Sequence, residues 1–337
     1  MAKLIRGTNG ADTIDGTWDA DEIRAGRGDD TIYGHGGGDL IFGGAGGDLI
    51  FVAEDDTVHG GAGDDSIVGV RLLGDYEIQA GAGDDTIFLA ETSSLWTENA
   101  LIHGGKGFDT IVFAGQNEIY ETDVVSVERF AFDRDGVEIR AREDQIFDAR
   151  GNMKVEVFGA DDDTVAQHLT IIGFDGRLDA SKLQVSNWDA DDLVELWGWG
   201  GDDRIIGSDH ADFLYGWDGN DTLNGGGGAD FLRGGAGADL FVIDVAAGPD
   251  AVDTIQDFVV GEDVVRLNAH GLGANRLGEK AFHVGTEAAD KADRVIYDRD
   301  TGALYFDRDG SGTAFEAVKI AQLSAGLDLS YRDFLLA

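Results

Sequence analysis

Short apolar segments recur at intervals of nine residues in two parts of the chain. In residues 37–51, GGDLIFGGAGGDLIF, the run LIF appears twice, each time after glycines and one aspartate. An apolar residue between two outward neighbours is typical of a very short strand with one inward side chain. The inward positions are Ile14, Ile23, Ile32, Ile41, Ile50, Ile205, Leu214, Leu223, Leu232 and Phe241. The pattern therefore predicts three-residue strands that alternate with tight turns.

Two nine-residue units form one coil of a solenoid, with the order strand, turn, strand, turn. Glycine tolerates positive φ, so the glycines that open each unit allow a sharp turn. Coils that stack at the usual strand spacing lie about 4.8 Å apart. A fixed period of this kind indicates a repeat architecture, so we predict an all-β parallel solenoid.

Each unit also carries one aspartate just before its strand, and these aspartates stack on the edges of the predicted coils. One edge holds Asp12, Asp30 and Asp48, opposite Asp21 and Asp39; in the second series Asp203, Asp221 and Asp239 lie opposite Asp212 and Asp230. Like charges at this spacing repel each other strongly. A hard dication between coils removes the conflict, and carboxylate and carbonyl oxygens in a flexible turn suit Ca²⁺ better than Mg²⁺.

The composition narrows the possible partners. The chain has 66 acidic and 25 basic residues, a formal net charge of -41, which disfavours binding to nucleic acid or to anionic membranes. Hydrophobic residues make up 42% of the sequence, too many for a simple acidic disordered chain. Cysteine is absent, which excludes disulfides and thiolate metal sites. No apolar run is long enough to predict a membrane span, so we expect no membrane insertion.

The repeats resemble those of the RTX (repeats-in-toxin) family of secreted bacterial proteins, whose unit reads G-G-x-G-x-D-x-U-x. The resemblance covers residues 7–51, 60–112 and 198–259. It implies a right-handed parallel β-roll, or β-helix solenoid, that binds several Ca²⁺ ions between successive turns. Three units depart from the motif: two have Asp19 and His210 at the fourth position, and the unit at 52–59 is one residue short. Sites beside these units are not expected with the same regularity.

The resemblance also implies the metal ligands, which are sixth-position aspartates and turn carbonyls. The implied carboxylates are Asp12, Asp21, Asp30, Asp39, Asp48, Asp65, Asp85, Asp109, Asp203, Asp212, Asp221, Asp230 and Asp239. The implied carbonyl residues are Gly26, Gly28, Gly44, Gly46, Gly219, Gly226, Gly228, Gly235 and Gly237.

The presence or absence of the glycine-rich repeats divides the chain into four predicted domains. Residues 1–112 form an N-terminal roll, 113–197 a degenerate metal-free solenoid segment, 198–259 a second roll, and 260–337 a C-terminal β cap. In the degenerate segment we expect strands at 129–133, 137–139, 154–158, 169–172 and 193–197. A separate globular β domain is the alternative for that segment.

The sequences at the two ends of the chain bear on whether and how the protein is exported from the cell. The first residues lack the apolar stretch of an N-terminal secretory peptide. The last ten, DLSYRDFLLA, resemble the uncleaved C-terminal signal that RTX proteins present to type I secretion machinery. A hairpin across Asp300 to Gly302 is expected within the cap, because a solenoid needs its exposed end covered. We therefore expect an extracellular or cell-surface protein.

Large apolar residues also occupy positions that should face outward. Leu40, Phe42, Leu49 and Phe51 flank inward residues, and Tyr33 should stack on Phe51. Cover by another segment of the chain is one interpretation, and a docking or self-assembly face is the other. Outward rings are also expected at Trp199 and Trp217, on adjacent coils; such a pair either packs on the turn or holds a sugar ring.

No catalytic motif accompanies the repeats. The sequence contains neither H-E-x-x-H nor G-x-S-x-G, and its seven histidines show no zinc-ligand spacing. We predict a non-catalytic, secreted, calcium-binding protein that folds on extracellular Ca²⁺ and acts in a cell-surface layer, matrix or filament. The alternatives are a secreted protein that binds or modifies a cell-surface polysaccharide, and an accessory module of a secreted toxin or enzyme.

Overall fold

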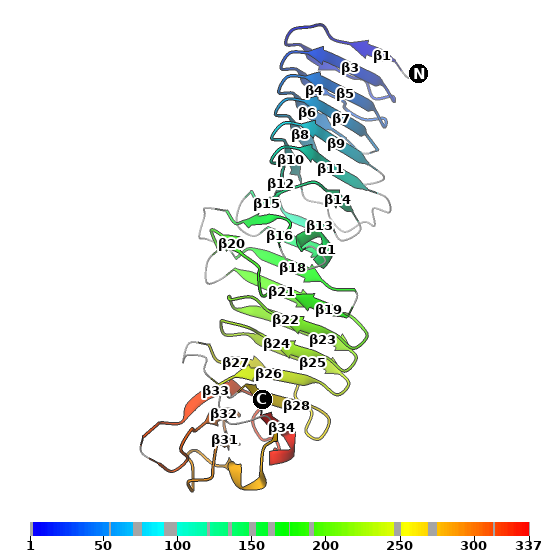
Figure 1. Cartoon of the computed structure of the whole chain (residues 1–337). Helices are drawn as coiled ribbons and strands as arrows, with labels where there is room; N and C mark the ends of the chain where they lie inside the picture. Colours follow the sequence, from blue (N-terminus) through cyan, green and yellow to red (C-terminus); the bar gives the residue numbers. More distant parts are fainter. Residues whose placement is uncertain are drawn as a thin grey trace. The chain divides into compact units, whose positions relative to one another are not determined.

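The computed structural model describes residues 3–53, 55–69, 76–90, 100–119, 122–133, 137–147, 153–160, 166–174, 176–188, 192–245, 251–268, 275–312 and 314–336. They belong to two compact units, and each is described by itself (Figure 1). Unit 1 comprises residues 1–170 and 184–192, and unit 2 comprises residues 171–183 and 193–337. The boundary falls inside strand β18 (His168–Ile172).

Unit 1 is built from parallel strands that alternate between two sheets, as the nine-residue period predicts. The first sheet contains, in order, β1 (Leu4–Arg6), β3 (Glu22–Arg27), β5 (Leu40–Ala45), β7 (Thr57–Ala62), β9 (Glu77–Ala82), β11 (Leu101–Lys106) and β14 (Asp123–Val125). The second contains β2 (Thr13–Asp15), β4 (Thr31–Tyr33), β6 (Leu49–Val52), β8 (Ser66–Gly69), β10 (Thr86–Leu89), β12 (Thr110–Phe113), β15 (Arg129–Phe132), β17 (Glu156–Phe158) and β20 (Val185–Ser186).

The core of unit 1 is a stack of inward side chains from successive strands. Ile32 pairs in register with Ile14 on one side and with Ile50 on the other. Ile32 and Ile50 are fully buried, and so are Ile23 and Ile41 of the facing sheet. The flanking residues point outward and stack on their equivalents, so that the Tyr33 and Phe51 rings lie 4.8 Å apart at 3°. Three apolar residues in a row are therefore compatible with one inward position, since the outer two pack along the coils.

The expected strands between the two repeat regions are present. They correspond to β15, β16 (Glu138–Arg142), β17, β18 and β21 (Leu193–Trp197). Within unit 1, β15 pairs in parallel with both β12 and β17, and β16 pairs in parallel with β13 (Gln116–Glu118). The short helix α1 (Glu143–Ile146) follows β16. The domain boundaries at 112 and 197 stay a prediction.

Unit 2 repeats the two-sheet arrangement. One row contains β21, β23 (Asp212–Asp218), β25 (Phe231–Ala236) and β27 (Asp253–Ile255). The other contains β19 (Arg177–Asp179), β22 (Arg204–Ile206), β24 (Thr222–Asn224), β26 (Leu240–Asp244) and β28 (Val264–Asn268). The inward Ile205, Leu214, Leu223, Leu232 and Phe241 are fully buried. The sequence therefore predicted the core of both units.

The C-terminal segment extends both rows of unit 2 and forms the predicted cap. Its elements are β29 (Asn275–Arg276), η1 (Glu279–Ala281), β30 (Phe282–Val284), β31 (Val295–Asp298), β32 (Ala303–Phe306), β33 (Val318–Gln322), η2 (Tyr331–Asp333) and β34 (Phe334–Leu336). Strand β33 adds in parallel to β27, and β34 adds in parallel to β28. The hairpin between β31 and β32 is confirmed, with Asp298 opposite Ala303.

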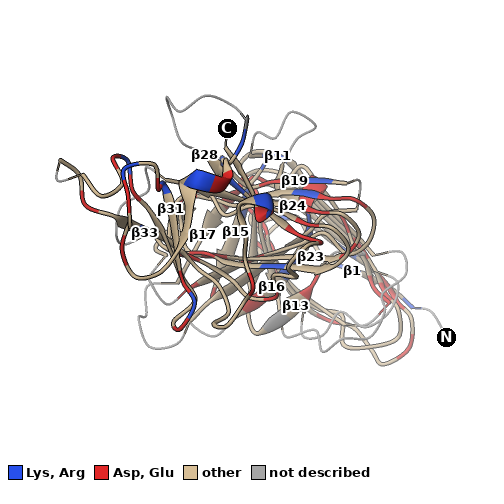
Figure 2. Ribbon diagram, turned by 90° about the horizontal axis from the view of Figure 1, so that it is seen from below, with Lys and Arg blue, Asp and Glu red and all other residues tan. Residues whose placement is uncertain are grey.

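Acidic residues outnumber basic ones along the ribbon, as Figure 2 shows by colour. No helix among the described residues is long and apolar enough to cross a membrane.

Because the coils stack closely, we predict that a side chain at position 44 destabilises the fold. Gly44 has φ of +121°, and an added Cβ would collide with the carbonyl oxygen of Gly26 on the preceding coil. We expect Gly44→Ala to lower the free energy of unfolding by about 2–3 kcal/mol, because it adds backbone strain to a collision. Urea unfolding in saturating Ca²⁺ measures the loss.

The matched control is Gly10→Ala. An added Cβ at Gly10 would meet no atom within 4 Å, and Gly10 does not have positive φ. Its unfolding free energy should stay within about 0.5 kcal/mol of the parent value, as for ordinary surface substitutions. Equal losses in the two variants would contradict the stacking argument.

Candidate metal centres

Stacked aspartates are joined from coil to coil by hydrogen bonds. The backbone N–H of each aspartate donates to Oδ1 of the aspartate one coil further along the chain. In unit 1 this ladder runs from Asp12 to Asp30 (2.7 Å), Asp48 (2.9 Å), Asp65 (2.8 Å), Asp85 (2.8 Å) and Asp109 (3.0 Å). The spacing of 18 residues thus corresponds to one coil, as the sequence predicts.

Three further ladders have the same bond, and each ends on an aspartate outside the nine-residue pattern. They are Asp21–Asp39–Asp56, Asp203–Asp221–Asp239–Asp263 and Asp212–Asp230–Asp253. Sequence reasoning missed Asp56, Asp253 and Asp263, because their turns depart from the glycine motif. The available signal was an aspartate two residues before an inward aliphatic residue, as in Asp253-Thr254-Ile255.

The second carboxylate oxygen of most of these aspartates is buried without a hydrogen-bond donor. Among the described residues this holds for Oδ2 of Asp30, Asp39, Asp48, Asp65, Asp85, Asp109, Asp221 and Asp230. An ionised oxygen that is removed from water without a partner is costly. Since the same oxygen recurs at successive coils, the cost recurs as well.

A backbone carbonyl of the next coil faces the same space as this oxygen. A Cβ added to Gly43 would lie 2.5 Å from both Asp48 Oδ2 and the carbonyl oxygen of Gly60. At Gly60 the corresponding atoms are Asp65 Oδ2, at 2.6 Å, and the carbonyl oxygen of Ala80. These turns therefore form small cradles of oxygens drawn from two coils. This donor set fits a hard cation with oxygen ligands, such as Ca²⁺.

Burial raises the pKa of these carboxyl groups above the usual range of aspartate. The pKa rises to about 6 for Asp48 and Asp85, and to about 7 for Asp65 and Asp239. Desolvation is the main cause, and neighbouring carboxylates add to it, as Asp30 does for Asp48. Backbone hydrogen bonds from the preceding coil act in the opposite direction. The fold by itself thus disfavours the charged form that a metal site requires.

Three of the predicted ligands lie in turns of a different kind. The hydroxyl groups of Thr8, Thr17 and Ser208 donate to Oδ2 of Asp12, Asp21 and Asp212, at 2.8, 2.8 and 3.0 Å. The backbone N–H groups of the same three residues donate to the same oxygens. These capped turns include the units with Asp19 and His210 at the fourth position, and neither of those residues has positive φ. Their carboxylates are already satisfied within the turn.

The predicted carbonyl residues have the left-handed backbone that the open turns need. All of Gly26, Gly28, Gly44, Gly46, Gly219, Gly226, Gly228, Gly235 and Gly237 have φ between +98° (Gly226) and +146° (Gly219). The cradle described above instead uses carbonyls at the first position of a unit, such as Gly60, which sequence reasoning did not single out. No three His, Cys, Asp or Glu side chains converge as a metal site within the described ranges, so a cation in these turns would also have backbone oxygens as ligands.

The predicted tryptophan pair is also present, in unit 2. The rings of Trp199 and Trp217 are 6.5 Å apart at 24°, and both side chains are about half exposed. Their φ values are +74° and +78°, at the position that glycines such as Gly26 and Gly44 hold in other units. The edge of Trp197 faces both rings, at 6.4 and 6.3 Å.

Comparison with known proteins identifies the repeats. Residues 4–28, 15–50, 53–69, 77–91, 195–223 and 206–241 match the RTX calcium-binding nonapeptide repeat. The chain therefore carries RTX repeats, which are calcium-binding units, on a parallel β-roll. No curated protein matches the chain.

One similar solved structure is that of the AlgE6R3 subunit of the mannuronan C5-epimerase from Azotobacter vinelandii. It is 29% identical, and the match covers 42% of this chain and 77% of that one, with a TM-score of 0.30.

The raised pKa values predict how the calcium-free fold responds to pH. The folded groups have a pKa of about 6 to 7, above the value of about 3.9 in an unfolded chain. The folded form therefore binds more protons, and its stability should increase as the pH falls from about 7.5 to about 5. Far-ultraviolet circular dichroism in calcium-depleted buffer measures this as a gain of β signal between about pH 7.5 and about pH 5. A β signal that falls or stays the same as the pH is lowered would contradict the burial of these groups.

Proposed function

We propose that this protein is a secreted calcium-binding β-roll protein whose repeats fold when Ca²⁺ enters the open turns. The observation that carries the proposal is the recurring cradle, in which a buried carboxylate oxygen without a donor faces a carbonyl of the next coil. One cation per cradle would satisfy both oxygens and neutralise the stacked charge.

The proposed ligands are the carboxylates of the open turns. They are Asp30, Asp39, Asp48, Asp65, Asp85, Asp109, Asp203, Asp221, Asp230 and Asp239, with turn carbonyls completing each site. Asp12, Asp21 and Asp212 are left out of this set, because their Oδ2 atoms accept hydrogen bonds from a threonine or serine. The proposed set of ligands is therefore smaller than the set that the family resemblance implies.

Calcium would act as a folding switch. A chain with a net charge of -41 repels itself when the cation is scarce, and a loose chain can pass through a secretion channel. Outside the cell, sites with dissociation constants of about 10⁻⁴ to 10⁻³ M would fill. Because only the folded form presents the cradles, binding free energy becomes folding free energy. Neighbouring coils form shared sites, so the transition should be cooperative.

A calcium titration followed by far-ultraviolet circular dichroism tests this switch. We expect little β signal in chelator and a steep, sigmoidal gain as Ca²⁺ is added, because the coils stabilise each other. Magnesium at the same concentrations should produce much less folding. A full β signal in chelator at neutral pH would contradict the proposal.

A pair of substitutions separates open from capped turns. Asp48→Asn keeps an oxygen that can accept the Asp30 N–H but replaces the buried Oδ2. We expect the Ca²⁺ midpoint to rise roughly tenfold, since affinity depends on ligand charge. Asp12→Asn is the control, because the Oδ2 of Asp12 accepts from Thr8, and its midpoint should barely change. Equal shifts would show that the hydrogen-bonding distinction does not select the sites.

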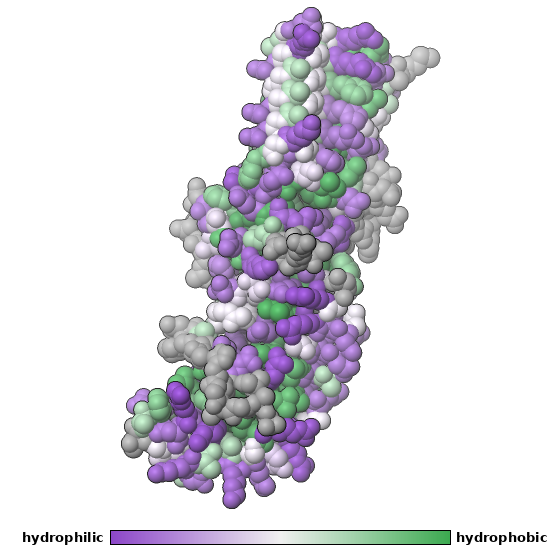
Figure 3. All heavy atoms as spheres, viewed as in Figure 1, coloured by the Kyte–Doolittle hydropathy of each residue, from purple (hydrophilic) through white to green (hydrophobic). Residues whose placement is uncertain are grey.

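We further propose that the folded protein is a non-catalytic structural or interaction protein, exported by type I secretion machinery to a surface layer, matrix or filament. Apolar side chains lie within the mostly hydrophilic face of unit 1 in Figure 3. Phe42 lies between Arg24, at 4.5 Å, and the ring of His59, at 4.9 Å, so neighbours in its own column cover part of it. Phe88 is more open, with 36% exposed.

A polysaccharide-binding role is the second candidate, favoured by the exposed tryptophans. Trp18, Trp199 and Trp217 are 82%, 53% and 51% exposed. Such rings provide flat apolar surface for a sugar.

Two measurements separate these roles. Growth of particle size with Ca²⁺ in light scattering, reduced by Phe42→Ser and Phe51→Ser, supports self-assembly. Binding to a glycan array that is lost in Trp199→Gly supports the polysaccharide role, and glycine suits the left-handed backbone there. A monomer that binds no glycan would contradict both roles.

A further inference from the structure

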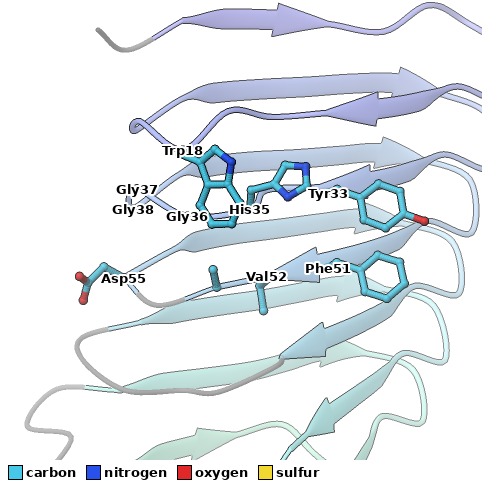
Figure 4. Close-up of a pocket in the computed structure, with 10 residues that line it drawn as sticks. Trp18, Tyr33, His35, Gly36, Gly37, Gly38, Phe51, Val52 and Asp55 are labelled. Atoms are coloured by element: carbon cyan, nitrogen blue, oxygen red, sulfur yellow. The ribbon is translucent and has the colours of Figure 1, made fainter.

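A groove in unit 1 brings together aromatic residues from neighbouring coils. It has a volume of about 710 Å³, and its lining includes Trp18, Tyr33, His35, Phe51 and Asp55. Figure 4 shows Trp18, His35 and Tyr33 in one row, with Phe51, Val52 and Asp55 in the row below. The groove borders the turn that leads into Asp39, because its lining includes Gly36, Gly37 and Gly38. The proposed metal site at that turn uses carboxylate and backbone oxygens, so it does not account for the aromatic side chains of the groove.

Two lining residues have an unusual backbone. His35 has φ of +70° and Asp55 has φ of +64°, although neither is glycine. His35 holds the second position of its unit, where other units have glycines such as Gly26 and Gly44. A non-glycine residue in this region costs about 1–3 kcal/mol, and such strain is concentrated at ligand sites. The strain thus falls on residues that line the groove.

Neighbouring rings of the groove are inclined to each other by between 3° and 31°. The centroids of Trp18 and His35 are 5.6 Å apart at 31°, and those of His35 and Tyr33 are 6.3 Å apart at 22°. Tyr33 and Phe51 are stacked at 3°. An ammonium cage needs rings that face one point from several sides. Rings inclined at these angles form a shelf instead, which suits the flat apolar face of a pyranose ring.

Trp18 presents most of its ring to solvent. Its side chain is 82% exposed, and its ring lies across Gly36, where a Cβ would be 3.5 Å from Trp18 Cε3. The absence of a side chain at Gly36 thus leaves room for the indole, which offers a large apolar area to a ligand.

Polar groups at the edges of the shelf can bind hydroxyl groups. His35 Nε2 lies 3.5 Å from Asp15 Oδ1, and the Asp15 side chain is 70% exposed. Asp55 is exposed on the opposite side, and Tyr33 carries a phenolic hydroxyl. These carboxylates and the net charge of -41 repel an anionic polymer. The charge therefore favours a neutral sugar.

We propose that this groove is a binding site for a neutral polysaccharide of hexopyranose units. One sugar ring stacks on Trp18 and Tyr33, while Asp15, His35 and Asp55 bind its hydroxyl groups. This inference rests on the polysaccharide-binding candidate above, and it assigns that role to a second site with its own residues.

Isothermal titration calorimetry with cellohexaose, laminarihexaose and maltohexaose tests the site in saturating Ca²⁺. The full chain carries Trp199→Gly and Trp217→Gly throughout, so that the aromatic cluster of unit 2 does not contribute. We expect one of these probes to bind, and Trp18→Ala to weaken its binding at least about tenfold, the effect of losing roughly one stacking contact. Phe88→Ala is the control, because Phe88 is an exposed ring in the sheet that contains Tyr33 and Phe51. This variant should bind the probe as before.

His35→Gly gives a readout that a purely structural role would not produce. It should weaken binding several-fold while raising the urea midpoint, because glycine relieves the strain at φ of +70°. Loss of both binding and stability would contradict the assignment.

Three other results would overturn the proposal. They are no binding of any neutral probe, equal weakening by Trp18→Ala and Phe88→Ala, and binding of oligogalacturonate in preference to the neutral probes. A Trp18-dependent change in oligomer mass without sugar binding would make the groove a contact between copies. The circular dichroism of each sample reports calcium-dependent folding separately, so an intact β signal without sugar binding contradicts the groove alone.

Discussion

The structure depends on carboxylates that are stacked one coil apart in the turns of a parallel solenoid. One oxygen of each aspartate joins adjacent coils, as in the 2.9 Å bond from Asp30 N–H to Asp48 Oδ1. The other oxygen is buried without a donor in most of the open turns, as at Asp30 and Asp48. The same residue therefore aligns the coils and leaves a charge that the protein alone does not neutralise. A cation that fills this gap makes folding conditional on its concentration.

Hydrogen bonding divides the turns into two classes, and this gives the roll its pattern of sites. Where the second residue of a unit is threonine or serine, its hydroxyl and N–H satisfy the carboxylate, as Thr8 does for Asp12. Where it is glycine, or is His35, Trp199 or Trp217, the backbone takes positive φ and offers the carboxylate no hydroxyl. At Gly44, for example, Oδ2 of Asp48 is left without a donor. At the end of the first ladder a glutamate replaces the aspartate, and Asp109 N–H donates to Glu128 Oε2 at 2.8 Å. A single side chain can thus decide whether a turn needs a cation.

The periodic part of the fold could be predicted from the sequence because each strand has one inward residue and one preceding aspartate. Ile32, Ile50 and Leu223 are buried as the period requires. Asp56, Asp253 and Asp263 could not be found in this way, because the turns before them lack the glycine motif, although they join the ladders as the predicted aspartates do. The groove at Trp18 was also missed, because Trp18 and His35 occupy different positions of their units and meet only when coils stack. The hydrogen bonds from Thr8, Thr17 and Ser208 to their aspartates could be recognised only from the geometry of the turns.

The most direct test of the central claim is the location of calcium in crystals of the full chain grown with excess Ca²⁺. Anomalous scattering places the ions without reference to the protein density. The account predicts ions at about 2.3–2.6 Å from Oδ2 of Asp48 and Asp221, and none at Oδ2 of Asp12 or Asp212. Turns at Asp48 and Asp221 that hold no ion under these conditions would contradict the account.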